Sequence, residues 1–189
     1  MVELFAINDG VRETYARRFH YILVDEFQDT NANQMAMIDG LSSVHRNLFV
    51  VGDDDQSIYS WRGARVEHIL EFEHLYPQTK VIRLEQNYRS TQTILDAANG
   101  VIEHNRGRKG KTLWTDAGAG EKVRVSASPD DESEALSLIG LVKREVEAGT
   151  SLKDIAVLYR TNAQSPALEE KLVQYSRIPY QLIGSVKFY

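Results

Sequence analysis

Short continuous apolar runs alternate along the chain with longer segments in which apolar residues recur every three or four positions. Continuous runs are typical of buried parallel strands, and the longer spacing is typical of amphipathic helices. Because the two patterns alternate, they predict an α/β fold with mainly parallel sheets and right-handed crossovers. The first run is apolar throughout, so we expect that strand to be covered on both faces. The segments predicted as strands are Tyr21–Val24, Leu48–Gly52, Val81–Leu84, the alternating Val123 and Val125, Ile155–Tyr159 and Tyr180–Ile183.

Helices are predicted where the helical spacing meets capping and stop signals. Asn8-Asp9-Gly10 precedes a short helix near residues 9–19, and Thr30 or Asn31 can cap the helix that carries Met35, Ile38 and Leu41. The alternation of strands and helices continues from residue 81 onward, so a second α/β domain is expected there. The remaining predicted helices are Val66–Leu75 before Pro77, Ile94–Ile102 capped by Ser90, residues 131–146 before Gly149, and one opened by Ser165-Pro166.

Two adjacent carboxylates, Asp25 and Glu26, directly follow the first predicted strand. In open α/β sheets, ligands bind in the crevice at the carboxyl ends of the strands. One carboxylate can hold Mg²⁺ there while its neighbour orients or deprotonates a nucleophile. The alternative is a strand-end turn with two solvated acids, and this stretch alone does not decide between the two interpretations.

The second predicted strand ends in the sequence Asp53-Asp54-Asp55-Gln56-Ser57. Strands joined in a βαβ unit point their carboxyl ends into the same crevice, so Gln56 could hydrogen-bond a terminal phosphate or an attacking water. Considered alone, this acidic loop is better interpreted as a solvated turn.

Tyr59, Trp61 and Arg62 follow in a loop that leads into a helix. The bases of single-stranded DNA stack on such rings, and a guanidinium can contact a phosphate. In isolation, Trp61 is equally well explained as a hydrophobic plug between the loop and the sheet.

A third candidate group lies at the turn between the strand predicted at Val81–Leu84 and the next helix. Here the Tyr88 ring can cover an adenine and Arg89 can reach a γ-phosphate, although such a pair is usually an ordinary surface feature. Further on, a solvated loop is favoured over a contact with the DNA backbone for the one basic cluster, Arg106, Arg108, Lys109 and Lys111.

Composition narrows the classes of protein that fit this chain. With 189 residues it can hold one ample core or two modest domains. A formal charge of -5 argues against a surface that grips nucleic acid all over, but it permits a local basic groove. The absence of cysteine excludes disulfides and thiolate metal sites. No apolar run approaches a membrane span and no signal-peptide pattern occurs, so we expect a cytoplasmic protein.

Three segments taken together resemble motifs II, III and IV of the UvrD/Rep/PcrA DNA helicases: Val24–Thr30, Val51–Ala64 and Leu84–Ser90. Two later segments, Ala156–Ser165 and Ile178–Gly184, resemble the stretch that precedes the 2B insertion of that family. Pro166 departs from the family, which more often has arginine there. The resemblance covers essentially the whole chain. It implies parts of two RecA-like (P-loop NTPase-type) domains, with residues 1–79 as the later part of domain 1A and residues 80–189 as the first part of domain 2A.

The resemblance implies an ATP-dependent DNA helicase that moves 3′ to 5′ on single-stranded DNA and opens duplex junctions, with ATP and Mg²⁺ as cofactors. Asp25 would bind Mg²⁺, Glu26 would be the base that positions the hydrolytic water, and Gln56 would sense the γ-phosphate and couple it to DNA. Tyr88 would stack on adenine, and Arg89 would approach the γ-phosphate. The residues that would contact the single strand are Tyr59, Trp61 and Arg62.

A phosphate-binding loop is missing from the 189 residues. Gly107–Thr112 contains Gly, Lys and Thr, but not at the spacing Gly-x-x-x-x-Gly-Lys-Ser/Thr. We therefore expect an internal section of a helicase that by itself neither hydrolyses ATP nor unwinds DNA. The alternative is a non-catalytic module that binds single-stranded DNA or a protein partner. Sheet edges exposed by such a truncation would favour a homo-oligomer.

Overall fold

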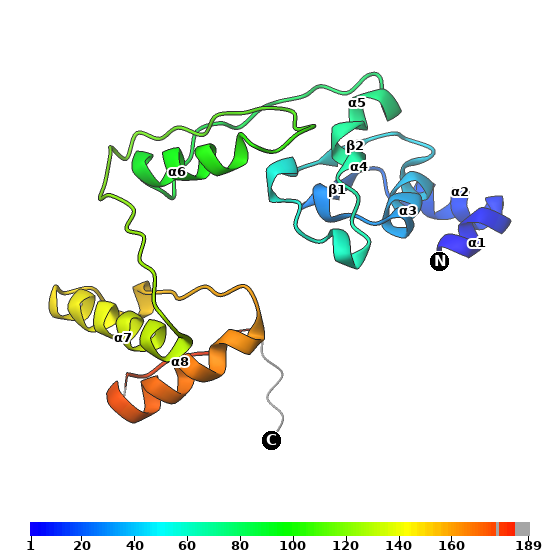
Figure 1. Cartoon of the computed structure of the whole chain (residues 1–189). Helices are drawn as coiled ribbons and strands as arrows, with labels where there is room; N and C mark the ends of the chain where they lie inside the picture. The colour runs from blue at the N-terminus through cyan, green and yellow to red at the C-terminus, as the bar shows by residue number, and fades with distance from the viewer. Residues whose placement is uncertain (177, 184–189) are drawn as a thin grey trace. The chain divides into compact units, whose positions relative to one another are not determined.

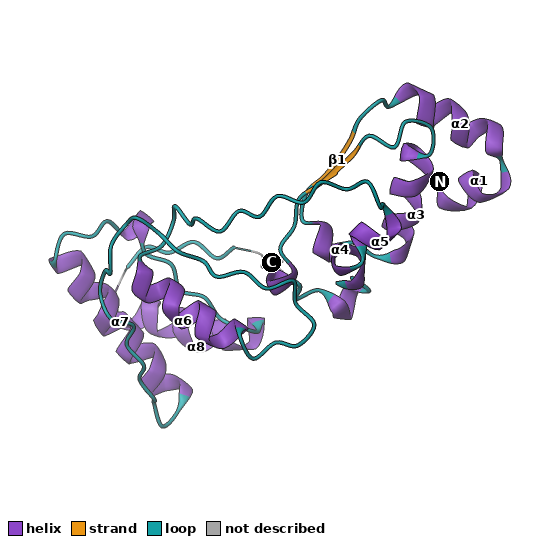
Figure 2. Ribbon diagram, turned by 90° about the horizontal axis from the view of Figure 1, so that it is seen from above, coloured by secondary structure: helices purple, strands orange, loops and turns teal. Residues whose placement is uncertain are grey.

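The first two apolar runs form a parallel two-stranded sheet. Strands β1 (Ile22–Val24) and β2 (Leu48–Val50) pair in the register Ile22 to Leu48, Leu23 to Phe49 and Val24 to Val50. The computed structural model describes residues 1–176 and 178–183, and these fall into two compact units, Met1–Val123 and Arg124–Tyr189. The sheet belongs to the first unit, where both strands are drawn in orange in Figure 2. Parallel strands flanked by helices fit the predicted α/β class.

One face of the sheet packs on the core of the first unit. The core centres on Phe27, Met35, Ile38 and Phe72. The rings of Phe27 and Phe72 meet edge to face, with centroids 5.3 Å apart, which is a favoured aromatic geometry. The half-buried residues that pack against this cluster include Ile22, Val24, Leu48 and Val50 of the sheet.

The opposite face of the sheet is open, so the prediction that β1 is covered on both faces is wrong for the described residues. Leu23 is 73% exposed and its partner Phe49 is 60% exposed. Side chains alternate between the faces of a strand, and the described helices cover one face only. An apolar run therefore indicates that its residues can be buried, but it does not show which element covers them.

Capping explains the helices around the sheet. Helix α2 (Asp9–Arg18) starts where the Asn8 side chain accepts a hydrogen bond from Val11 N, and α3 (Ala32–Ser42) starts with a capping box between Asn31 and Gln34. These starts confirm the predicted helices and select Asn31 over Thr30 as the cap. A helix not predicted from the sequence, α1 (Val2–Ile7), packs its buried Phe5 against Gly40 of α3.

The segment after β2 is built from short turns and short helices. The 3₁₀ turns Asp54–Gln56 and Ser60–Arg62 precede α4 (Glu67–Leu70) and α5 (Phe72–Leu75). One continuous helix was predicted over Val66–Leu75, and it is instead interrupted at Glu71, whose φ of -96° and ψ of 5° leave the helical region. The remaining 3₁₀ turns among the described residues are Phe27–Asp29, Leu152–Asp154 and Asn162–Gln164.

Helix α6 (Gln92–Ile102) ends the regular part of the first unit (Figure 1). It begins after Thr91 rather than Ser90, and no side chain caps it, so the predicted Ser90 cap is wrong. A segment that we call the return segment, residues 112–119, runs back along the turn before the helix. Its Trp114 forms a single parallel bridge with Gln86. The predicted strand Val81–Leu84 does not form, and neither does the strand at Val123 and Val125.

Among its described residues, the second unit has two main helices. Helix α7 (Asp131–Glu147) is followed by Gly149 at a φ of 100°, and α8 (Ser165–Lys171) carries Pro166 in its first turn, both as predicted. Asp130 caps α7, a role that was not predicted from the sequence. A π-helical turn, Leu172–Ser176, continues α8. Packing between the helices buries Ala135, Ile139 and Leu172.

Neither predicted strand of the second unit, Ile155–Tyr159 and Tyr180–Ile183, pairs with another segment among the described residues. Gly184 and the residues that follow it to Tyr189 lie outside the described residues. None of the described helices combines the length and the apolar character needed to cross a membrane.

Candidate functional site

The segments that follow the two strands are hydrogen-bonded to each other. Val51 N donates to Val24 O over 2.8 Å, and Phe27 N donates to Val51 O over 2.9 Å. These bonds extend the parallel pairing beyond β2. The residues after the two strands therefore lie at one edge of the sheet, as predicted from the βαβ pattern.

Gly52 allows this close approach. A Cβ atom at position 52 would lie 2.7 Å from Gln28 Oε1, 2.8 Å from Ile69 Cδ1 and 3.2 Å from Phe27 N. Such distances are shorter than normal van der Waals contacts, and one of them is to backbone. The glycine therefore lets the two candidate motifs touch, and a side chain at this position would push them apart.

Gln28 links the two strand ends. Its side chain is almost fully buried, with 1% of the residue exposed. Gln28 Nε2 donates to Glu26 Oε2 over 2.7 Å, and Gln28 Oε1 accepts from Asp53 N over 3.0 Å. One amide thus orients the Glu26 carboxylate and fixes the start of the next loop. The sequence predicted no role for Gln28, and its burial beside two carboxylates is visible only in the fold.

Glu26 has an uncommon backbone conformation, with a φ of 49° and a ψ of 44°. Non-glycine residues rarely adopt this left-handed conformation, and such cases are frequent at functional sites. Glu26 N donates to Asp25 Oδ1 over 2.9 Å. Both residues are exposed, so the two carboxylates predicted to carry chemistry are accessible to solvent at the edge of the sheet.

Asp29 is a less expected acid in the same segment. Its Oδ1 atom is buried and has no hydrogen-bond partner among the described residues. Burial raises the pKa of Asp29 above its ordinary value, and the nearby Glu26 carboxylate raises it further. The segment after β1 therefore contains one acid whose ionisation is disfavoured by burial.

Gln56 is held by Asp53 at the start of a segment that we call the acidic loop, Asp53–Gln56. Gln56 Nε2 donates to Asp53 Oδ2 over 2.7 Å, and Gln56 N donates to Asp53 O over 2.9 Å. Burial alone would raise the pKa of Asp53, but hydrogen bonds from Lys111 and Gln56 outweigh it and lower the pKa below its ordinary value. Asp53 thus stays ionised and keeps the exposed Gln56 amide in place.

The aromatic loop, Tyr59–Arg62, presents its rings to solvent. Trp61 is 68% exposed, which excludes the alternative that it plugs a gap between loop and sheet in this structure. The Arg62 guanidinium carbon lies 4.6 Å from the Trp61 ring centroid and 5.2 Å from that of Tyr59. These cation–π contacts restrict the orientation of the two rings and place a positive charge beside them.

Tyr88 and Arg89 occupy a turn organised by Asn87. Asn87 Oδ1 accepts from Arg89 N over 2.9 Å and from Ser90 N over 2.7 Å, and the Tyr88 hydroxyl donates to Gln86 Oε1 over 2.8 Å. Tyr88 is 86% exposed. Within the described residues, neither Tyr88 nor Arg89 makes a hydrogen bond or ion pair with Asp25, Glu26 or Gln56. The structure therefore joins the first two candidate groups directly and leaves the third as a separate exposed turn.

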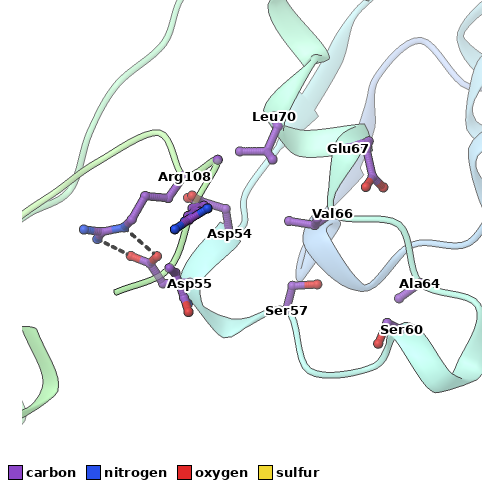
Figure 3. Close-up of a pocket in the computed structure, with 12 residues that line it drawn as sticks. Asp54, Asp55, Ser57, Ser60, Ala64, Val66, Glu67, Leu70 and Arg108 are labelled. Carbon is purple, nitrogen blue, oxygen red and sulfur yellow. Dashed lines mark hydrogen bonds and ion pairs between the residues drawn. The ribbon is translucent and has the colours of Figure 1, made fainter. Parts of the chain in front are cut away.

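Three residues of the basic cluster, Arg108, Lys109 and Lys111, are held in ion pairs, so the solvated loop favoured from the sequence is wrong for these three, whereas Arg106 is exposed. We call residues 105–111 the basic loop, and it lies against the acidic loop (Figure 3). Arg108 pairs with Asp55, Lys111 with Asp53, and Lys109 with Glu73 of α5. A cavity of about 300 Å³ lies between the two loops and α4. No local pattern in the sequence indicates that these oppositely charged segments meet.

Comparison with known proteins identifies the family of this chain. Residues 1–77 match the model of the UvrD/REP helicase N-terminal domain, and residues 82–189 match that of the UvrD-like helicase C-terminal domain. The chain belongs to the UvrD-like helicases. This membership confirms the resemblance inferred from the three sequence motifs.

Two relatives of this UvrD-like chain are proteins named ATP-dependent DNA helicase PcrA. The one from Staphylococcus epidermidis (strain ATCC 35984) is 46% identical over 188 residues, and the one from Staphylococcus aureus (strain Mu50) is 48% identical over 188 residues. Each match covers 100% of this chain and 26% of the relative. The chain thus spans about a quarter of the length of these helicases.

Proposed function

We propose that this chain carries part of the ATPase and single-strand-binding machinery of an ATP-dependent DNA helicase that translocates 3′ to 5′. The proposal rests on one observation, the continuous hydrogen-bonded path from Glu26 through Gln28 and Asp53 to Gln56. This path ties a candidate base to a candidate phosphate sensor, and the exposed aromatic loop follows three residues after Gln56. A nucleotide site and a DNA-contacting loop would then share one rigid connection.

Each of the exposed groups has a proposed role in this machinery. Glu26 is the base that positions and deprotonates the hydrolytic water, and its carboxylate is oriented for this by Gln28. Gln56 is the γ-phosphate sensor. Tyr88 stacks on adenine and Arg89 neutralises charge on the γ-phosphate. The residues proposed to bind single-stranded DNA are Tyr59, Trp61 and Arg62.

Asp25 fits the role of a magnesium ligand. Its Oδ1 atom accepts from Glu26 N, and its Oδ2 atom has no hydrogen bond within the described residues. No cluster of three or more potential metal-ligating side chains occurs among residues 1–176 and 178–183. Nucleotide-bound Mg²⁺ characteristically takes one or two carboxylates and completes its shell with water and phosphate oxygens. The ion, when bound, would neutralise phosphate charge, and Asp25 would supply one oxygen to hold it.

The domain assignment is part of the same proposal. Residues 1–79 would be the later part of RecA-like domain 1A, and residues 80–189 the first part of domain 2A. The two family matches, which fall on either side of residues 78–81, support this boundary. The expected self-association stays a prediction.

The proposed roles can be tested in a chimera in which this chain replaces the matching 188 residues of the S. epidermidis PcrA. We expect the chimera to show ATPase activity stimulated by single-stranded DNA, and the isolated chain to show none because its sequence has no phosphate-binding loop. Glu26→Gln in the chimera should lower kcat by about 10²- to 10⁴-fold. A folded chimera in which Glu26→Gln keeps its full kcat would contradict the assignment of the base.

A second candidate function is non-catalytic binding of single-stranded DNA, and the exposure of Trp61 favours it. Fluorescence anisotropy with a labelled oligothymidine separates this function from the first. Measurable binding by the isolated chain that is lost in Trp61→Ala and kept in Trp114→Phe would support a binding module. Binding that both variants retain would exclude the aromatic loop as the DNA contact.

A further inference from the structure

The basic loop binds the acidic loop through a bidentate ion pair. Arg108 Nε donates to Asp55 Oδ1 over 2.8 Å, and Arg108 Nη2 donates to Asp55 Oδ2 over 2.5 Å. The Asp55 side chain is 8% exposed and that of Arg108 is 20% exposed. A bidentate guanidinium–carboxylate pair fixes both distance and orientation, and partial burial protects it from solvent.

Lys111 and Lys109 make further contacts with the acidic loop. Lys111 Nζ donates to Asp53 Oδ1 and lies 3.7 Å from Asp55 Oδ2. The backbone N of Lys109 donates to Asp54 Oδ2 over 2.9 Å. All three aspartates of the acidic loop are thus engaged by the basic loop. Because Asp53 Oδ2 also accepts from Gln56, Lys111 and Gln56 share one carboxylate.

The basic loop continues directly into the return segment, which is hydrogen-bonded to the turn that carries Tyr88 and Arg89. The Asn99 side chain brackets Leu113, accepting from its N over 3.3 Å and donating to its O over 3.0 Å. Trp114 N donates to Glu85 O over 3.1 Å, and Asn87 N donates to Trp114 O over 2.8 Å. The return segment, α6 and the turn are therefore joined by hydrogen bonds, and the basic loop is connected to them through the chain.

We propose that Arg108 and Lys111 are positioning residues that couple the Tyr88–Arg89 turn to Gln56 and the aromatic loop. The inference rests on the proposed function for the identity of the coupled sites, but the mechanical link stands on the contacts alone. A displacement of the turn moves the basic loop, and the ion pairs then displace Asp53 and Asp55. Gln56 moves with Asp53 because the two side chains are hydrogen-bonded. Coupling of this kind requires a physical connection between two sites, and these ion pairs supply one.

The link is tested in the 189-residue chain carrying Trp114→Phe, so that Trp61 is the one tryptophan reporter. Lys111→Met and Arg108→Gln each remove one positive charge from the ion pairs between the basic loop and the acidic loop. Lys109→Met removes the same charge, but its side chain pairs with Glu73 outside the acidic loop, so it is the matched control. Lys111→Arg keeps the charge and should rescue the contact.

We expect the amide protons of Asp55 and Gln56 to exchange about fivefold faster in Lys111→Met and Arg108→Gln, a ratio typical of the loss of a partly exposed ion pair. Trp61 fluorescence should change in the same two variants and in neither Lys109→Met nor Lys111→Arg. Circular dichroism identifies any variant that has unfolded as a whole. The exchange rates and Trp61 fluorescence of Lys111→Arg and Lys111→Met then show whether the charge at position 111 holds the acidic loop in place.

Equal exchange rates and equal Trp61 spectra in Lys111→Met, Arg108→Gln and Lys109→Met would overturn the proposal. These measurements use no nucleotide and no DNA. An inactive chimera would therefore refute the proposed function without affecting the link, and unchanged exchange rates would refute the link without affecting the proposed function.

Discussion

At the scale of single residues, the site depends on groups that make contact across the sheet edge. Gln28 is the central example, because it binds Glu26 two positions away and Asp53 25 positions away. The sequence indicated the exposed acids correctly as residues at a strand end. It could not indicate Gln28, since nothing local to an amide reveals a partner that distant in the chain.

Gly52→Ala should destabilise the first unit by about 1–3 kcal/mol, because the added methyl group overlaps Gln28, Ile69 and the Phe27 backbone. Urea unfolding measures the change. Gly100→Ala is the matched control, since Gly100 lies in α6 with nothing within 4 Å of an added Cβ. That control should stabilise the chain by about 0.5–1 kcal/mol through helix propensity. Equal effects at the two positions would show that the strand ends are not tightly apposed.

Asp29 predicts a pH dependence of stability. The folded-state pKa of Asp29 is raised above the ordinary 3.8. Its stabilising contribution to the free energy of unfolding is therefore present below pH 3.8 and is lost as the pH rises through the raised pKa. Asp29→Asn should therefore remove a fall in stability that begins above pH 3.8. Chemical unfolding from pH 3 to pH 7 measures this difference. Asp130→Asn should act with the opposite sign, because backbone and side-chain hydrogen bonds from Ser133 lower the pKa of Asp130.

At the scale of elements, local signals predicted the helices well and the strands poorly. Asn8 and Asn31 cap helices through bonds to residues three positions on, so their role can be read from the sequence. A strand needs a hydrogen-bonded neighbour. Val81–Leu84 and Ile155–Tyr159 have the composition of strands and no such neighbour among the described residues, which is why these predictions failed.

The capping box of α3 gives a prediction at this scale. Asn31→Ala should cost about 1 kcal/mol of unfolding free energy, because Gln34 N loses its acceptor at the helix start. Asn33→Ala, an exposed position inside the same helix, should be neutral or slightly stabilising. Thermal unfolding of both variants measures the difference, and a larger loss in Asn33→Ala would argue that α3 begins elsewhere.

At the scale of the whole molecule, the charge of -5 and the engaged basic loop limit binding to DNA. If Arg62 alone contacts phosphate, the logarithm of the binding constant for oligothymidine should fall with the logarithm of salt concentration at a slope of about -0.7. Were Arg108, Lys109 and Lys111 also on the strand, the slope would approach about -2.8. Titration between low and moderate salt separates the two outcomes, and Trp61→Ala should weaken binding without changing the slope.

The pairing of Arg108 with Asp55 joins positions 53 residues apart in the chain, and this has a consequence for how such sequences diverge. A change at one end leaves a partly buried charge without its counterpart, which is more costly than changing both ends together. Among relatives, position 108 should therefore exchange arginine for a neutral residue mainly where position 55 has also lost its carboxylate, and Lys111 and Asp53 should follow the same pattern. Counting such paired replacements across many sequences would test the contact without a single experiment on the protein.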